Sequence, residues 1–155
     1  MTVPLEAPTR RATAVTRLLQ DTLVELIDLS LQAKQAHWNV VGPGFRPLHV
    51  FLDELALQFR DWYDDVAERL VALEVAPDGR APTVSATTPL DQLPLGPLTD
   101  RTVVMLFGER LTVVGDRVRE RAAEIGDADL ASQDLLVEVL RGLDKQRWML
   151  RAHQA

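Results

Sequence analysis

Two of the three histidines in the chain and three carboxylates share one stretch of sequence. They are His37, His49, Asp53, Asp64 and Glu68. The last four follow Pro47 in a segment that has neither glycine nor proline as far as Leu73, so they can lie on one unbroken helix. At 100° per residue they fall within about 100° of one another around the helix axis. Imidazoles and carboxylates that share a face with apolar residues need a partner, and a metal ion suits this mixture.

The rise of a helix prevents one copy of this segment from placing all four groups around one ion. His49 and Asp53 are one turn apart, as are Asp64 and Glu68, but roughly 17–22 Å of helix axis separates the two pairs. A second copy packed antiparallel about a two-fold axis near Gln58 sets one pair against the other. Such a contact produces two equivalent sites. The spacing therefore predicts metal sites that are shared between subunits.

Composition restricts the class of protein. At 155 residues the chain forms one domain with a proper core. We expect no transmembrane helix and no export signal, and therefore a cytoplasmic location. The absence of cysteine excludes disulfides and thiolate catalysis. A net charge of −6 argues against nucleic-acid binding by the surface as a whole and favours the attraction of cations.

Apolar residues at three- and four-residue steps predict four long helices that position these groups. Their expected ranges are Thr13 or Thr16 to Trp38, Pro47 to Leu73, Thr99 or Asp100 to Ile125, and Asp129 to His153. Residues 1–12 are expected to form a flexible tail. A proline-rich crossover from Val75 to Leu98 is expected to hold one short helix within Ser85–Leu93, starting at Thr87 or Thr88. A crossover of this length is typical of a ferritin-type bundle, so residues 13–155 are predicted to form an all-α four-helix bundle.

The motif resembles that of the Dps family, the DNA-binding proteins from starved cells or miniferritins. The matching residues are His37-Trp38-Asn39, Gly42-Pro43-x-Phe45, His49-x3-Asp53-x10-Asp64-x3-Glu68, Leu26–Leu31, Ala67–Arg69 and Leu143–Lys145. The similarity covers nearly all of the chain beyond the first dozen residues. Larger ferritins use a Glu-x-x-His motif, and none occurs in this sequence.

This resemblance implies an iron-storage and detoxification protein that protects DNA from oxidative damage. It implies a ferroxidase that oxidises Fe(II), usually with hydrogen peroxide, and a dodecameric shell that stores the ferric mineral. Each dinuclear site would hold two irons on a subunit two-fold axis. His37, His49 and Asp53 would come from one subunit, and Asp64 and Glu68 from its neighbour.

Several residues have two interpretations. Asp53 either binds metal or orients a histidine. Trp38 and Trp62 either intercept radicals near the metal or fill an interface. Asp61 and Asp65 are solvated or pair with Arg60 and Arg69. Four acids near the end of the third helix either line an iron-entry pore or reflect ordinary capping: Glu120, Glu124, Asp127 and Asp129. We expect Trp148 and Met149 to pack inward and His153 to lie on the surface.

The alternative function is a nucleoid-associated protein that shields DNA by coating it. Many members of the family bind DNA through a mobile, lysine-rich tail. The corresponding residues here include Arg10 and Arg11 but no lysine, and Glu6 reduces the local charge. A shell of many subunits would carry many copies of this tail, and their combined avidity could bind DNA even if each tail binds weakly. This alternative therefore stays open.

Overall fold

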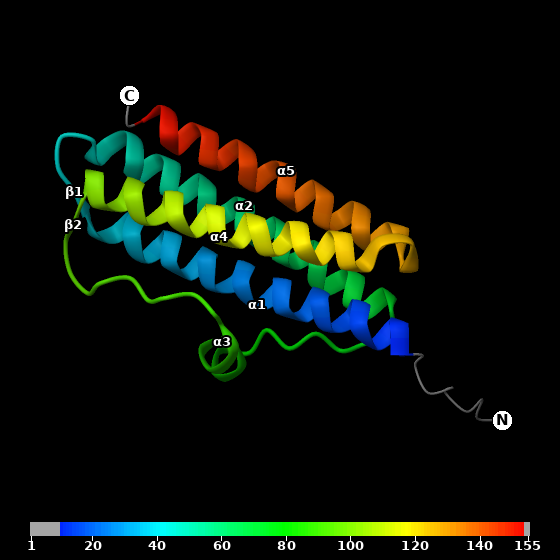
Figure 1. Cartoon of the computed structure of the whole chain (residues 1–155). Coiled ribbons are helices and arrows are strands. Elements are labelled where there is room, and N and C mark those ends of the chain that lie inside the picture. Colours follow the sequence, from blue (N-terminus) through cyan, green and yellow to red (C-terminus); the bar gives the residue numbers. More distant parts are fainter. Residues whose placement is uncertain (1–9, 154–155) are drawn as a thin grey trace.

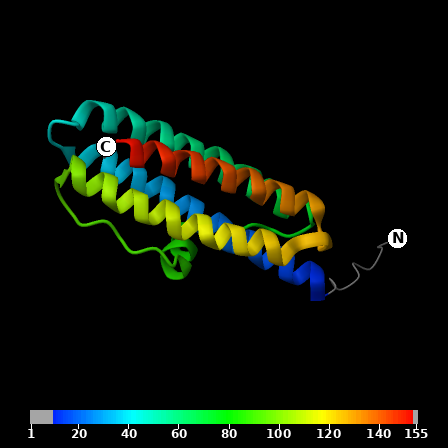
Figure 2. The same cartoon turned by 45° about the horizontal axis from the view of Figure 1, so that its top comes forward.

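The structure, a computed structural model, describes residues 10–153. The helices and strands in this range are α1 (Arg10–Asn39), β1 (Val40–Val41), α2 (Phe45–Ala72), α3 (Ala81–Thr87), β2 (Leu98–Thr99), α4 (Asp100–Ile125), a 3₁₀ turn (Gly126–Ala128) and α5 (Leu130–Ala152). Helices α1 and α2 form one antiparallel hairpin, and α4 and α5 form another (Figure 1). A long crossover that contains α3 returns along the outside of the bundle, so α2 and α4 run parallel (Figures 1 and 2). The predicted all-α, four-helix bundle is confirmed.

The ends of the last two long helices agree with the sequence because capping residues set them. Thr99 accepts a hydrogen bond from the Thr102 amide at the start of α4, and Asp129 accepts one from Ser132 at the start of α5. Gly126, with φ of +45°, ends α4. None of the helices in residues 10–153 is long and apolar enough to cross a membrane.

Two boundaries differ from the prediction. Helix α1 begins at Arg10 and so includes residues assigned to the tail, whereas residues 1–9 lie outside the described range. The short helix lies earlier in the crossover than Ser85–Leu93. Pro82 occupies its first turn, where a missing amide hydrogen is harmless, and Thr88 ends it in an extended conformation. Thr88 precedes Pro89, which disfavours helical geometry in the residue before it.

Aliphatic and aromatic side chains of the four long helices fill the interior. Fully buried members of this core include Leu19, Leu26, Leu52, Phe59, Phe107, Leu111, Leu136 and Leu143. Burial of each such side chain contributes about 1.5–3 kcal/mol. Two residues expected to pack inward do not: Trp148 is 59% exposed and Met149 is 39% exposed.

Buried polar groups attach the crossover to the bundle. The Arg110 guanidinium of α4 donates to Gln32 Oε1 at 2.6 Å and to the carbonyl oxygen of Asp91 at 2.9 Å. Thr88 donates to the buried Asp28 carboxylate at 2.5 Å. Since buried polar groups without partners are costly, these bonds fix the path of the crossover across α1 and α4.

A second buried ionic cluster joins α1 to α4. The Glu25 carboxylate is fully buried and accepts hydrogen bonds from Arg121 and, at 3.4 Å, from Arg117. Arg121 also donates to the Thr22 hydroxyl at 3.2 Å. Two guanidinium groups therefore compensate the charge of one carboxylate inside the bundle.

The contact between α2 and α5 leads to a stability prediction. A Cβ atom added at Gly142 would lie 2.0 Å from Cζ2 of Trp62, a rigid indole that is 6% exposed. We expect Gly142→Ala to lower the free energy of unfolding by about 1–3 kcal/mol, measured by urea denaturation, because the indole must shift. Gly108→Ala is the matched control: its Cβ meets no atom within 4 Å, so a gain of about 0.5–1 kcal/mol is expected. Equal stability of Gly142→Ala and the unmodified protein would contradict this packing.

Candidate metal site

Two histidines hold each other in place at the junction of α1 and α2. The rings of His37 and His49 stack with centroids 3.6 Å apart and planes inclined by 19°. His37 Nδ1 lies 2.7 Å from the carbonyl oxygen of His49, and His49 Nδ1 lies 2.8 Å from the carbonyl oxygen of His37. The His37 carbonyl is in the last turn of α1, where no intrahelical donor is available, so His49 also satisfies this helix end.

These reciprocal bonds determine which ring nitrogens are free. A carbonyl oxygen only accepts, so Nδ1 of both His37 and His49 must carry the hydrogen. In a neutral imidazole the lone pair then lies on Nε2. Metal-binding histidines are commonly oriented in this way, through a hydrogen bond from the nitrogen that does not bind the metal. The pair therefore offers two oriented nitrogen donors.

The short loop between the helices makes this contact possible. Gly42 has φ of +119°, a conformation that glycine adopts readily, and the Gly44 amide donates to Asp100 Oδ2 at 2.7 Å. A Cβ atom at Gly44 would lie only 2.9 Å from the same oxygen. Strand β1 pairs in parallel with β2, which fixes the loop to the start of α4. The hydrogen bonds from Gly44 and Arg101 also lower the pKa of Asp100, although burial opposes them.

Asp53 lies one turn after His49 and is engaged by a lysine. Lys34 Nζ donates to Asp53 Oδ1 at 2.6 Å. This hydrogen bond is the main reason that the pKa of Asp53 is lowered; burial raises it, and the charges of Lys34, His37 and His49 lower it further. Lys34 Nζ also lies 5.8 Å from the ring centroid of Trp38. A metal ion that takes Asp53 as a ligand must compete with Lys34.

Lys34 is the functional neighbour that the sequence reasoning missed. It lies three residues before His37, and this spacing places the two side chains on the same face of α1. The side chains of Lys34 and Asp53 are 35% and 47% exposed, so solvent screens their attraction. The pair is consequently one that a divalent cation could displace.

The remaining two predicted ligands lie in the second half of α2. Asp64 and Glu68 are exposed, and neither has a hydrogen-bond or ion-pair partner among the described residues. Within residues 10–153 of one chain, no three histidine or acidic side chains converge on a common point. The structure brings His37 and His49 into contact and places Asp53 near enough for their charges to lower its pKa. These three side chains do not by themselves form a metal site, and Asp64 and Glu68 lie apart from them, as the length of the helix requires.

An ion pair fixes the end of α2 beside Glu68. Arg69 Nη2 lies 2.8 Å from both carboxylate oxygens of Asp129, and Arg69 Nε donates to the Ser132 hydroxyl at 2.9 Å. Burial raises the pKa of Asp129, but hydrogen bonds from Ser132 and Arg69 outweigh it and keep the pKa below its ordinary value. Arg69 therefore joins α2 to α5 and does not pair with Asp61 or Asp65.

For some of the residues that had two interpretations, the structure favours one of them. Trp38, next to His37, is 67% exposed, whereas Trp62 packs in the core against Phe59 at a centroid distance of 5.9 Å. Asp129 acts as a cap and ion-pair partner, as ordinary helix capping predicts. Glu120 and Asp127 are exposed, and a pore role for them stays a prediction. His153 is exposed, as expected.

Residues 16–155 match the family model for ferritin, described as a ferritin-like domain. DNA protection during starvation protein 2 of Deinococcus radiodurans is 39% identical over 134 residues; these cover 86% of this chain but only 56% of that protein. The DNA protection during starvation protein of Agrobacterium fabrum is 33% identical over 96% of this chain and 92% of its own length. The fine tangled pili major subunit of Haemophilus ducreyi is 37% identical over 90% of this chain and 74% of its own length.

Solved structures agree with these relatives. The crystal structure of Dps92 from Deinococcus radiodurans superposes with a TM-score of 0.91 at 37% identity and covers 93% of this chain and 87% of that one. Mycobacterium smegmatis Dps gives a TM-score of 0.90 at 31% identity, with coverage of 98% and 94%. The fold and the sequence therefore point to the same group of proteins.

The Arg69–Asp129 pair predicts a pH-dependent stability. Because the pKa of Asp129 is lower in the folded chain, its contribution is fully present above the unfolded pKa of about 3.9 and is lost as the pH falls through the folded value. Asp129→Asn retains a capping side chain but removes the ion pair, so we expect a loss of about 1–3 kcal/mol at neutral pH. The loss should shrink below pH 4, as followed by urea denaturation at several pH values. Asp134→Asn, at an exposed position on the same helix, should change neither the stability at neutral pH nor the dependence of stability on pH.

Proposed function

The chain belongs to the Dps family of ferritin-like proteins, and on this premise we propose that it is an iron-storage and detoxification protein with ferroxidase activity. Its substrates would be Fe(II) and, as oxidant, hydrogen peroxide, and the ferric product would be stored inside a dodecameric shell. The observation that carries this proposal is the pair of reciprocal hydrogen bonds between His37 and His49, which leaves the lone pair of each Nε2 atom available to bind a metal ion.

A second copy of the chain would complete the site. Two copies of α2 packed antiparallel about a two-fold axis would set Asp64 and Glu68 of one against His37, His49 and Asp53 of the other. The exposure of both carboxylates and their lack of partners in the described chain support this arrangement. Imidazole nitrogens and carboxylate oxygens together form a donor set suited to Fe(II).

The side chains have separate tasks in the proposed reaction. The hydrogen bonds at Nδ1 hold His37 and His49 in the orientation that iron binding requires. The anionic oxygens of Asp64 and Glu68 stabilise the more highly charged Fe(III) more than Fe(II), which favours oxidation. Two ferrous ions at one site supply the two electrons that convert one hydrogen peroxide and two protons into two water molecules. Paired delivery would avoid the release of hydroxyl radical.

This function predicts the loss of rapid iron oxidation in carboxylate variants. Purified protein loaded anaerobically with Fe(II) and mixed with hydrogen peroxide should oxidise iron rapidly, followed by ferric absorbance, and saturate near two irons per shared site. Asp64→Ala and Glu68→Ala should reduce the rate to that of iron in buffer and leave the assembly intact, since both residues are exposed and unpartnered. Asp65→Ala is the control on the same helix. Oxidation by the unmodified protein that is no faster than in buffer would contradict the proposal.

The Lys34–Asp53 pair predicts that Lys34 limits iron loading. Lys34→Gln should release Asp53 and strengthen the binding of Fe(II), because the carboxylate no longer has a competing cation. We expect a gain in affinity of no more than roughly tenfold in anaerobic Fe(II) titrations, since solvent screens this partly exposed pair. Asp53→Asn should abolish this gain in the double variant. Unchanged Fe(II) affinity in Lys34→Gln would contradict the prediction, because it would mean that Lys34 does not compete with iron for Asp53.

Direct coating of DNA is a second candidate, favoured by the names of several relatives, which refer to DNA protection. Electrophoretic mobility shift at low salt and at about 0.15 M salt separates the two functions, since phosphate contacts weaken steeply as salt rises. With a net charge of −6 we expect no shift at the higher salt. A shift that persists there would support coating, whatever the rate of iron oxidation.

A further inference from the structure

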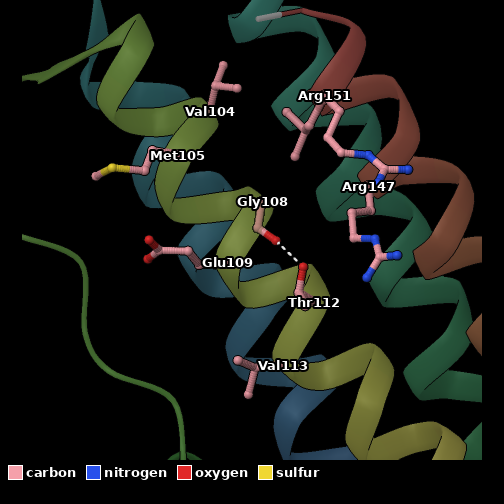
Figure 3. A pocket seen from close by; sticks show the side chains of 9 residues that line it. Val104, Met105, Gly108, Glu109, Thr112, Val113, Arg147 and Arg151 are labelled. Atoms are coloured by element: carbon pink, nitrogen blue, oxygen red, sulfur yellow. Dashed lines mark hydrogen bonds between the residues drawn. The ribbon is translucent and has the colours of Figure 1, made fainter.

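A groove of about 530 Å³ runs between α4 and α5, away from the two histidines. Its walls come from α4 residues such as Val104, Met105 and Val113, and from Arg147 and Arg151 of α5 (Figure 3). Met105 and Val113 are 49% and 43% exposed. The groove is therefore an open, mainly apolar channel with two guanidinium groups along one side.

The arginine on this groove has an unsatisfied donor. Among the described residues, Nε of Arg147 is the one buried side-chain nitrogen or oxygen without a hydrogen-bond partner. Buried polar atoms are normally paired, and each exception calls for an explanation. The other guanidinium nitrogens of Arg147 also have no acceptor among the described residues, and an oxygen of an anion is the strongest acceptor that a guanidinium can take.

The neighbouring acids do not supply that acceptor. Arg147 and Arg151 lie one turn apart on α5 and form no ion pair with any described residue. Asp144, one turn before Arg147, pairs with Arg119 at 3.7 Å. Glu109 also lines the groove, but its carboxylate projects from the side of α4 away from both arginines (Figure 3).

The helix end alone does not explain this pair. Arg151 is in the last turn of α5, where the helix dipole favours a cation. The dipole, however, provides no acceptor for the Arg147 guanidinium and does not relieve the repulsion between two like charges one turn apart. An anion bound between the two terminal guanidinium groups would do both.

We propose that Arg147 and Arg151 form a site for an oxyanion, a phosphate or carboxylate group that accepts hydrogen bonds from the terminal nitrogens of both guanidinium groups. The planar fork of arginine suits an acceptor with two or more oxygens. An adjoining hollow of about 490 Å³ shares Val104 with the groove and is lined by Asp100, Arg101 and His153, so it adds one acidic and two basic side chains at the same end of the bundle. The oxyanion has two possible sources: free inorganic phosphate, or a carboxylate of another copy of the chain.

Phosphate titration with matched variants tests the site. Inorganic phosphate is titrated calorimetrically into the full-length protein at constant ionic strength, and the mass of the assembly is measured by sedimentation with and without phosphate. We expect Arg147→Gln and Arg151→Gln to weaken phosphate binding at least tenfold, and Arg147→Lys to weaken it less, since it keeps the charge but loses the fork. Lys145→Gln, at an exposed position on α5 outside the groove, is the control and should bind like the unmodified protein.

The two sources give different results. If free phosphate is the ligand, binding is saturable in the unmodified protein and the mass is the same in every variant. If a carboxylate of another copy fills the groove, phosphate finds no site, and Arg147→Gln lowers the mass of the assembly whereas Lys145→Gln does not. Phosphate binding that is unaffected by Arg147→Gln, or no binding together with an unchanged mass, overturns the proposal. The peroxide-driven oxidation of Fe(II), measured on the same samples, tests the proposed function separately.

Discussion

The straight, unbroken axis of α2 is the constraint on which the candidate site depends. Because each residue advances the helix by 1.5 Å, the nitrogen donors near its start cannot meet the carboxylates near its end. One face of the helix is held by buried Leu52, Phe59 and Val66, and its end is held to α5 by Arg69. Bending is therefore opposed along the whole length of α2. A complete donor set then requires a second chain.

The rest of the fold positions α2 and the candidate ligands that it carries. The glycine-containing loop turns the chain sharply enough for His37 to stack on His49, and the β1–β2 pair and Asp100 hold that loop in place. The crossover must span the length of the bundle before α4 can begin beside the loop, and buried bonds to Arg110 and Asp28 fix its path. Structure far from the ligands is consequently part of their positioning.

Sequence reasoning predicted the helix ends marked by Thr99 and Asp129, because capping involves neighbouring residues. The five candidate ligand positions stay a prediction, to which regular helical spacing and the family motif both led. Contacts between helices were not predictable in the same way. The Lys34–Asp53 pair depends on how α1 and α2 are rotated against each other, which periodicity fixes only coarsely. The reciprocal histidine bonds likewise need the actual fold of the loop.

Charge complementarity would favour the proposed antiparallel arrangement even before any metal binds. The start of α2 carries His49 and lies beside His37 and Lys34 of α1, whereas its second half carries the exposed carboxylates of Asp64 and Glu68, which have no partner among the described residues. Parallel packing would place these acids against their own copies, and like charges in contact are unfavourable. Antiparallel packing would place them against the lysine and the histidines. In that arrangement Lys34 would attract the carboxylates of the other chain and would also compete with a metal ion for Asp53, so alignment and metal loading would make opposing demands on it.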